Sequence, residues 1–177
     1  MAAQNLAAAL QRVETVLLRR PETGLHDDAP ATARWDGGTR VIASHANGAQ
    51  VLTDMPAELG GTGDQVTPGW LFRAGLASCA ATCIVMVAAR EGIELTLLEL
   101  RASSRSDTRG LLGMAGADGQ PVPATPGDMQ LLVRIAATGV PPARLRALVE
   151  QGIRFSAVPS AVREAVPLAL HIEVEGG

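Results

Sequence analysis

The fold is decided by residues 67–90, which read TPGWLFRAGLASCAATCIVMVAAR. Thr67 suits a helix N-cap because its side-chain oxygen accepts a backbone N–H, and Pro68 suits the first helical position because the N–H it lacks would have no partner there. From residue 74 onward the segment is apolar on nearly every side, which is typical of a helix covered on two faces. We therefore expect a buried central helix from Pro68 to about Arg90, ended by Gly92.

The segments on either side of this helix alternate between strand-like and turn-like composition. Before the helix, the pattern predicts strands at 32–35, 40–44 and 49–53, joined by turns at 36–39 and 45–48. After it, we expect strands at 95–104 and 129–138, a helix from Pro141 to about Gly152, and a last strand at 166–175 with alternating apolar residues. The glycine- and proline-rich connection at 105–127 is typical of a lid, a binding loop or a disordered segment. This order of elements predicts an α+β fold with an antiparallel sheet.

The N-terminal segment has the spacing of an amphipathic helix. Leu6, Leu10, Val13 and Leu17 fall on one face, and Pro21 ends the pattern. We expect residues 1–21 to form an extra helical appendage that packs against its own chain or a partner subunit. Residues 31–177 then form the main domain.

Composition excludes several classes of protein. A chain of 177 residues suits one domain, and 47% hydrophobic with 2% aromatic residues indicates an aliphatic core. All 15 basic residues are arginine, which excludes Schiff-base chemistry and a P-loop lysine. A net charge of −3 gives no support to a nucleic-acid partner. The apolar run at 74–89 is shorter than the ~20 residues that a membrane span needs. With no secretory signal apparent, we expect a cytoplasmic protein without a membrane partner.

Cys79 is the first candidate for chemistry. A mid-helix cysteine usually behaves as a small buried hydrophobe, and it becomes a nucleophile only in an electropositive, partly exposed setting. Arg34 and Arg40 beside the first hairpin, and Arg105 after the fourth strand, are the candidate cations.

Cys83 lies one helical turn beyond Cys79 and shares its face. Side chains four residues apart on a helix have Cβ atoms ~5–6 Å apart, whereas a disulfide needs ~3.5–4.5 Å. The pair therefore suits neither a redox couple nor, with His26, His45 and His171 scattered along the chain, a four-ligand zinc site. We expect no metal and no cofactor.

Two adjoining motifs carry a family resemblance. Residues 55–61, MPAELGG, followed by the helix start at 67–79, resemble the OsmC/Ohr family of osmotically inducible and organic-hydroperoxide-resistance proteins. In that family a similar ELGG loop and a P-x-x-L-F-x-x-G-x-x-x-C helix lead to the peroxidatic cysteine. The resemblance extends from about residue 32 to residue 174. It implies an intertwined homodimer, with two central helices between two sheets, and places Cys79 at the peroxidatic position.

The chain departs from the hydroperoxide-resistance branch at two positions. That branch has a glutamate ten residues before the cysteine, where this chain has Gly69, and the nearest carboxylates, Glu58 and Asp64, are not at the matching place. It also has a resolving cysteine in the stretch that here reads RFSAVPS, residues 154–160, with Phe155 or Ser156 at that position.

The resemblance therefore implies a one-cysteine thiol peroxidase that acts on organic hydroperoxides. Cys79 is its nucleophile, an arginine (Arg40 first, then Arg34 or Arg105) stabilises the thiolate, and an external thiol resolves the sulfenic acid. Cys83 and Glu58 are secondary candidates. The alternative is a catalytically degenerate dimeric scaffold that binds a small apolar ligand and keeps Cys79 as an inert packing thiol.

Overall fold

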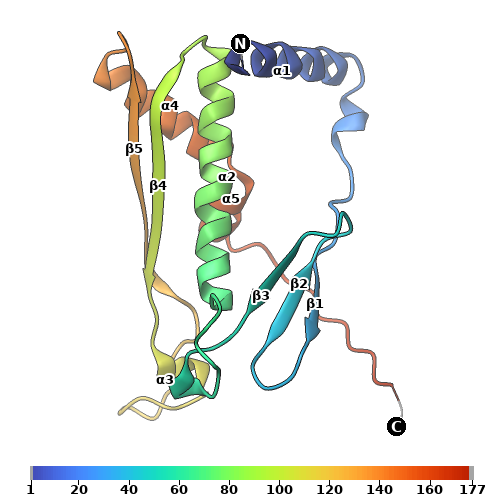
Figure 1. The fold of residues 1–177 in the computed structure, drawn as a ribbon, viewed down its shortest axis with the longest axis vertical. Helices are drawn as coiled ribbons and strands as arrows, with labels where there is room; N and C mark the ends of the chain where they lie inside the picture. Colours follow the sequence, from blue (N-terminus) through green and yellow to red (C-terminus); the bar gives the residue numbers. More distant parts are fainter. Residues whose placement is uncertain (1, 176–177) are drawn as a thin grey trace.

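The long helix α2, Pro68–Arg90, is the axis around which the chain is arranged (Figure 1). The computed structural model describes residues 2–175. In chain order the elements are α1 Ala2–Arg19, η1 Pro21–Gly24, β1 Thr32–Trp35, β2 Val41–Ser44, β3 Gln50–Thr53, η2 Ala57–Leu59, α2, β4 Leu95–Arg105, α3 Thr108–Leu111, β5 Gly127–Ala137, α4 Pro142–Arg154 and α5 Ala157–Glu164. The strands form two antiparallel sheets, β1-β2-β3 and β4-β5, which confirms the α+β class.

Helix α2 begins and ends where the sequence predicts. The Thr67 hydroxyl accepts the Trp70 N–H at 3.1 Å, with Pro68 at the first position. The last turn closes on Glu91, and Gly92 follows with φ +66°. By length and composition this helix could cross a membrane, a criterion that the core helix of a soluble protein also meets.

One side of α2 carries the core. Ile84, Val87 and Ala88 pack with Leu148 of α4 in a buried cluster, to which β4 and β5 add apolar side chains. Gly152 lets α4 approach closely, because a Cβ there would lie 2.7 Å from Cγ1 of Ile84. This contact sets where the chain after α4 meets α2.

The other side of α2 is uncovered over much of its length. The β1-β2-β3 sheet stands apart from it, connected through the loop at 54–67, and α1 lies across the end of α2 (Figure 1). Exposed residues recur at helical spacing along this side: Gly75, Ser78, Thr82 and Val85. We call these four residues the open face of α2.

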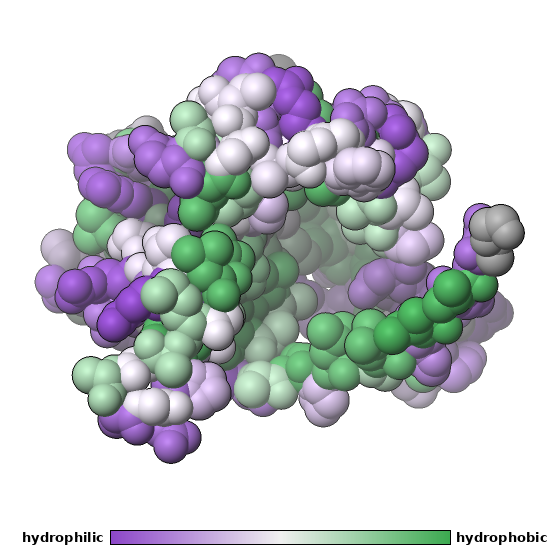
Figure 2. Space-filling model, turned by 90° about the horizontal axis from the view of Figure 1, so that it is seen from below, coloured by the Kyte–Doolittle hydropathy of each residue, from purple (hydrophilic) through white to green (hydrophobic). Residues whose placement is uncertain are grey.

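The expected last strand, 166–175, is wrong for the single chain. These residues are not paired with either sheet, and Leu168 is 93% exposed. The segment runs away from the body of the molecule, with its apolar residues showing in Figure 2 as a continuous hydrophobic arm. A strand needs a sheet edge to satisfy its N–H and C=O groups, and in the single chain residues 166–175 form no ladder with either sheet.

Two further differences lie in regions expected to be irregular. The 105–127 connection contains the single-turn helix α3 and a bridge between Ala115 and Pro121. Helix α5, which the sequence analysis missed, follows α4 after a sharp turn at Phe155.

Candidate active site

Ser156 and Cys79 form the centre of the candidate site. The Ser156 hydroxyl donates to Sγ of Cys79 at 3.1 Å, and Ser156 is 0% exposed. Ser156 is the N-cap residue of α5, yet its side chain makes no capping hydrogen bond. Its hydroxyl is directed at the thiol of α2 instead.

The first backbone N–H groups of α5 also point at Cys79. Those of Ala157 and Val158 donate to the sulfur. N–H groups in the first turn of a helix have no partner within the helix, and the helix dipole makes this end favourable for negative charge. The thiol therefore lies where a cysteine pKa is commonly lowered.

The balance of these influences favours the thiolate of Cys79. Partial burial acts against it and raises the pKa of Cys79. The Ser156 hydroxyl, the N–H groups of Val158 and Ala157, and the Cys83 thiol together outweigh burial, so the pKa of Cys79 lies below that of an ordinary thiol.

Cys83 has the opposite tendency. Burial, and to a smaller extent the neighbouring charge of Cys79, raise its pKa, although a hydrogen bond with Ser156 opposes them. Its thiol donates to the Phe155 carbonyl at 3.5 Å. Cys83 is therefore the protonated member of the pair.

The packing of α4 on α2 determines where the Ser156 hydroxyl and the first N–H groups of α5 lie. Because Gly152 allows α4 to contact Ile84 directly, the chain reverses next to Cys83, where the Ser156 N–H bonds to the Ile153 carbonyl at 3.2 Å. Helix α5 then starts beside Cys79. The sequence signal for α5 was a serine followed within one turn by Pro159, a pattern typical of a helix start.

Arg40 is engaged in a polar cluster away from Cys79. Its guanidinium donates to Thr62 at 2.8 Å and to Asp64 at 2.7 Å, and its Nε lies 3.5 Å from the Asp54 carboxylate. These contacts connect the residue just before strand β2 to the loop that leads into α2.

Asp54 is the buried centre of this cluster. It accepts from the Thr39 hydroxyl at 2.5 Å, the Thr62 N–H at 2.9 Å and the Met55 N–H at 2.8 Å. The hydrogen bond from Thr39, followed by those from Thr62, holds the pKa of Asp54 far below its usual range even though burial opposes this. The sequence analysis missed Asp54, although an aspartate directly after a strand at the start of a glycine-rich loop is a common loop anchor.

The other candidates also lie apart from the thiol. Arg34 pairs with Asp36 at 3.1 Å, and Arg105 lies 3.8 Å from Asp128. Glu58 is an exposed residue of η2. Within residues 2–175 of one chain, no arginine side chain hydrogen-bonds to Cys79. The three expected arginines, Arg40, Arg34 and Arg105, each lie beside a carboxylate of the same chain instead.

An apolar groove of about 830 Å³ lies along α5 and the start of β5. Its lining includes Ala157 and Val158, whose N–H groups donate to the Cys79 sulfur. The groove also extends over Phe72, Met129 and Val162.

The backbone of the groove is strained at two places. Asp128 and Ala165 both line it, and both have left-handed φ angles, of +50° and +49°. Outside glycine, such conformations are unfavourable and tend to cluster at functional sites. The groove is therefore the best-supported ligand site beside the thiol.

Comparison with known proteins supports the family resemblance. The family model described as OsmC-like protein matches residues 61–171. No curated protein matches the sequence. Among solved structures, an organic hydroperoxide resistance protein from Legionella pneumophila aligns with a TM-score of 0.57 and 23% identity, over 78% of this chain and 91% of that one.

Two further solved structures have the same fold. An OsmC-like protein from Mycoplasma pneumoniae aligns with a TM-score of 0.64 and 14% identity, over 78% of this chain and 89% of that one. An organic hydroperoxide resistance protein from Elizabethkingia anophelis aligns with a TM-score of 0.56 and 20% identity, over 78% and 90% of the two chains. At these identities the structures show the fold alone, while the family model covers more than half of the chain. The chain belongs to the OsmC-like protein family.

Proposed function

We propose that this protein is a thiol-dependent peroxidase that reduces organic hydroperoxides, with Cys79 as its nucleophile. The observation that carries the proposal is the set of donors around the sulfur: the Ser156 hydroxyl and the first N–H groups of α5. They stabilise a thiolate without a cation from the same chain. Thiolate is the nucleophilic form of cysteine, so these contacts prepare the residue for attack on an O–O bond.

The peroxide step oxidises Cys79 by two electrons. The thiolate attacks the distal oxygen of the hydroperoxide, an S–O bond forms, and the O–O bond breaks. Sulfur becomes a sulfenic acid, and the departing alkoxide takes a proton from solvent to leave as an alcohol. The Ser156 hydroxyl and the α5 N–H groups hold the sulfur in place throughout.

An external thiol completes the cycle. Its sulfur attacks the sulfenic acid of Cys79 to form a mixed disulfide and water. A second external thiol then attacks the mixed disulfide, which releases the Cys79 thiol and joins the two external thiols in a disulfide. Cys83 does not take this role in our proposal. It lies one turn away on the same helix, and its thiol is hydrogen-bonded to the Phe155 carbonyl.

The groove supports organic over inorganic peroxide. Aliphatic and aromatic side chains line the groove, which shares Ala157 and Val158 with the surroundings of the sulfur, so an alkyl or aryl group gains from leaving water there. Hydrogen peroxide has no apolar group to place in the groove.

A homodimer is part of the proposal. Val85 in the open face of α2 and the apolar residues of the unpaired segment 166–175 are exposed in one chain. A second copy would cover α2 and offer a sheet edge to the segment. An arginine from that copy is then the candidate cation for Cys79.

One equivalent of cumene hydroperoxide tests the proposal. We expect the intact protein to gain the mass of one oxygen atom, with the modification located at Cys79 by peptide mass spectrometry. Cys79→Ser should abolish the gain, and the matched change Cys83→Ser should preserve it. An unmodified Cys79 thiol in folded protein contradicts the proposal.

A second candidate function is that of an apolar-ligand-binding scaffold. Two departures from the hydroperoxide-resistance branch favour it. Gly69 occupies the position of the branch's glutamate, and Phe155 or Ser156 occupies the position of its resolving cysteine. This function requires that Cys79 react with iodoacetamide no faster than an ordinary thiol at neutral pH, while a fluorescent apolar probe binds the groove with or without the Cys79 side chain.

A further inference from the structure

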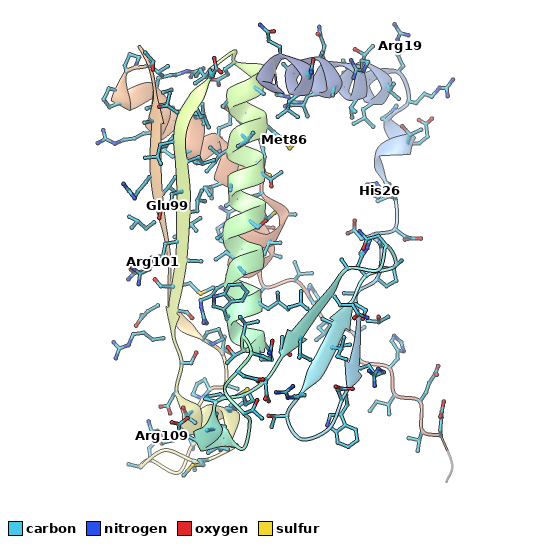
Figure 3. The ribbon with its side chains drawn as sticks, viewed as in Figure 1. Arg19, His26, Met86, Glu99, Arg101 and Arg109 are labelled. Carbon is cyan, nitrogen blue, oxygen red and sulfur yellow. The ribbon has the colours of Figure 1, made fainter. Side chains whose placement is uncertain are left out.

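Helix α1 rests on α2 with only its first half. Leu6 and Leu10 are half-buried where α1 crosses the end of α2, and Glu14 lies 3.8 Å from Arg90 of α2. Beyond this point α1 extends sideways past the edge of α2 (Figure 1), and Arg19 marks its far end in Figure 3.

The face of α1 that packs on α2 continues as a partly exposed apolar face, on which Cδ2 of Leu17 lies 3.3 Å from where a Cβ on Gly24 of η1 would be. Leu6, Leu10, Val13 and Leu17 lie on one side of the helix at spacings of four, three and four residues. The first two are half-buried, whereas Val13 is 56% and Leu17 is 37% exposed. We call Val13 and Leu17 the overhang stripe.

The overhang stripe lies on the same side of the molecule as the open face of α2. Figure 1 shows α1 extending from the end of α2 on the side opposite β4 and β5, with η1 and the connection to β1 at its far end and the β1-β2-β3 sheet lower on that side. In Figure 3, Met86 points from α2 away from β4 and β5, toward the space beneath α1. A molecule that covers the open face of α2 therefore also meets the underside of α1.

Helix α2 is too apolar to remain uncovered. Its most apolar 18-residue window is only 28% buried in one chain. A second copy offers a surface of the same character, because a two-fold dimer joins the same patch of both subunits. The small residues in the open face, Gly75, Ser78 and Thr82, permit close approach of another helix.

We propose that α1 is a dimer clamp whose overhang stripe packs against a second copy of the chain. This inference rests on the homodimer of the proposed function and adds an interface outside the residues that match the family model, 61–171. Each α1 would hold its own α2 through Leu6 and Leu10 and the second copy through Val13 and Leu17.

A matched pair of double variants tests the clamp in the full chain. Val13→Asp with Leu17→Asp places two charges in the stripe, and Thr15→Asp with Leu18→Asp places two charges on other faces of α1. We expect the first pair to raise the dimer dissociation constant, measured by sedimentation velocity over a concentration series, at least tenfold more than the second. Equal effects of the two pairs, or a wild-type chain that is monomeric throughout the series, overturn the clamp.

A photo-crosslinker at Val13 provides a second measurement that does not depend on how the charged variants fold. We expect a cross-linked product of twice the chain mass, and cross-links confined to a single chain overturn the clamp. The cumene hydroperoxide assay remains independent. Oxidised Cys79 with failed cross-linking rejects the clamp alone, and inert Cys79 with dimeric cross-links rejects the peroxidase alone.

Discussion

The hydroxyl of Ser156 reaches the sulfur of Cys79 at 3.1 Å, from a position fully enclosed between α2 and the start of α5. Neither residue is near the other in sequence. They meet because Gly152 lets α4 lie directly on Ile84, which brings the following turn beside α2. The site thus depends on a packing contact as much as on the cysteine itself.

Replacing Ser156 by alanine should make Cys79 less reactive. A hydrogen bond to a charged group contributes roughly 1.5–3 kcal/mol, and Cys79 is only half-buried, so we expect about a three- to tenfold slower reaction with iodoacetamide at pH 7. The rate profile should also shift to higher pH, because the thiolate loses a donor. Ser160→Ala, one turn further along α5, is the control and should leave the profile unchanged. An unshifted profile for Ser156→Ala would remove Ser156 from the site.

Replacing Ser156 by cysteine should create a resolving thiol. The wild-type oxygen lies 3.1 Å from the Cys79 sulfur, so a sulfur on the same Cβ is within reach of a sulfenic acid on Cys79. An organic hydroperoxide should then yield its alcohol, one water and one intramolecular disulfide, seen as the loss of two free thiols on mass mapping. Ser160→Cys should give no such disulfide. Without a disulfide in Ser156→Cys, the site geometry described here is wrong.

The sequence predicted most of the fold because most of its elements carry local signals. Thr67, Pro68 and Gly92 mark both ends of α2, and Gly37 and Gly48 mark the two turns of the first sheet. Segment 166–175 has an equally good strand pattern but lies unpaired. Alternating apolar and polar residues indicate that a strand would have an apolar face, but they do not indicate whether a sheet edge is available for pairing.

The candidate site was predictable only in part. Cys79 was identified by its family motif, whereas its donors come from Ser156 and the backbone of α5, and a backbone N–H has no sequence signature. We expected an arginine beside Cys79 because reactive thiols generally lie in an electropositive setting. In one chain Arg40 is instead held by Asp54 and Asp64, which sequence spacing alone does not reveal.

Gly152→Ala should destabilise the fold and the site together. The added Cβ would lie 2.7–2.9 Å from Ile84, whose side chain is fully buried and has no room to shift. Overpacking of this kind costs about 1–3 kcal/mol, measured as a lower free energy of unfolding in urea. Gly69→Ala is the matched control, since its Cβ meets its nearest neighbour at an ordinary 3.6 Å. If Gly152→Ala is no less stable than the control, the close α2–α4 contact is absent.

Asp54 should make stability depend on pH in the acid range. Its pKa is lowered in the folded chain, chiefly by Thr39 and then Thr62, from an ordinary 3.8. Below that value the unfolded chain binds the proton first, so the free energy of unfolding should fall as pH decreases from about 4. Asp54→Asn should lack this part of the slope, whereas Asp28→Asn, in an exposed linker, should retain it. Identical slopes for both variants would contradict the described network.

The segment 166–175 should become ordered when two copies associate. In one chain its backbone groups face solvent, so its amides should exchange rapidly at protein concentrations where the monomer dominates. In the dimer that we propose, pairing with a sheet edge should protect them, and protection in hydrogen-exchange mass spectrometry should rise with concentration.

Proline at the centre of the segment separates strand pairing from simple apolar contact. Leu170→Pro removes an N–H needed by a strand ladder, whereas Leu170→Ala keeps the N–H and loses only apolar surface. If 166–175 pairs as a strand, proline should weaken dimerisation well beyond alanine and abolish the protection. If the two variants behave alike, the segment binds the second copy through its side chains only. Amides that exchange rapidly at every concentration would show that 166–175 stays unpaired in the dimer as well.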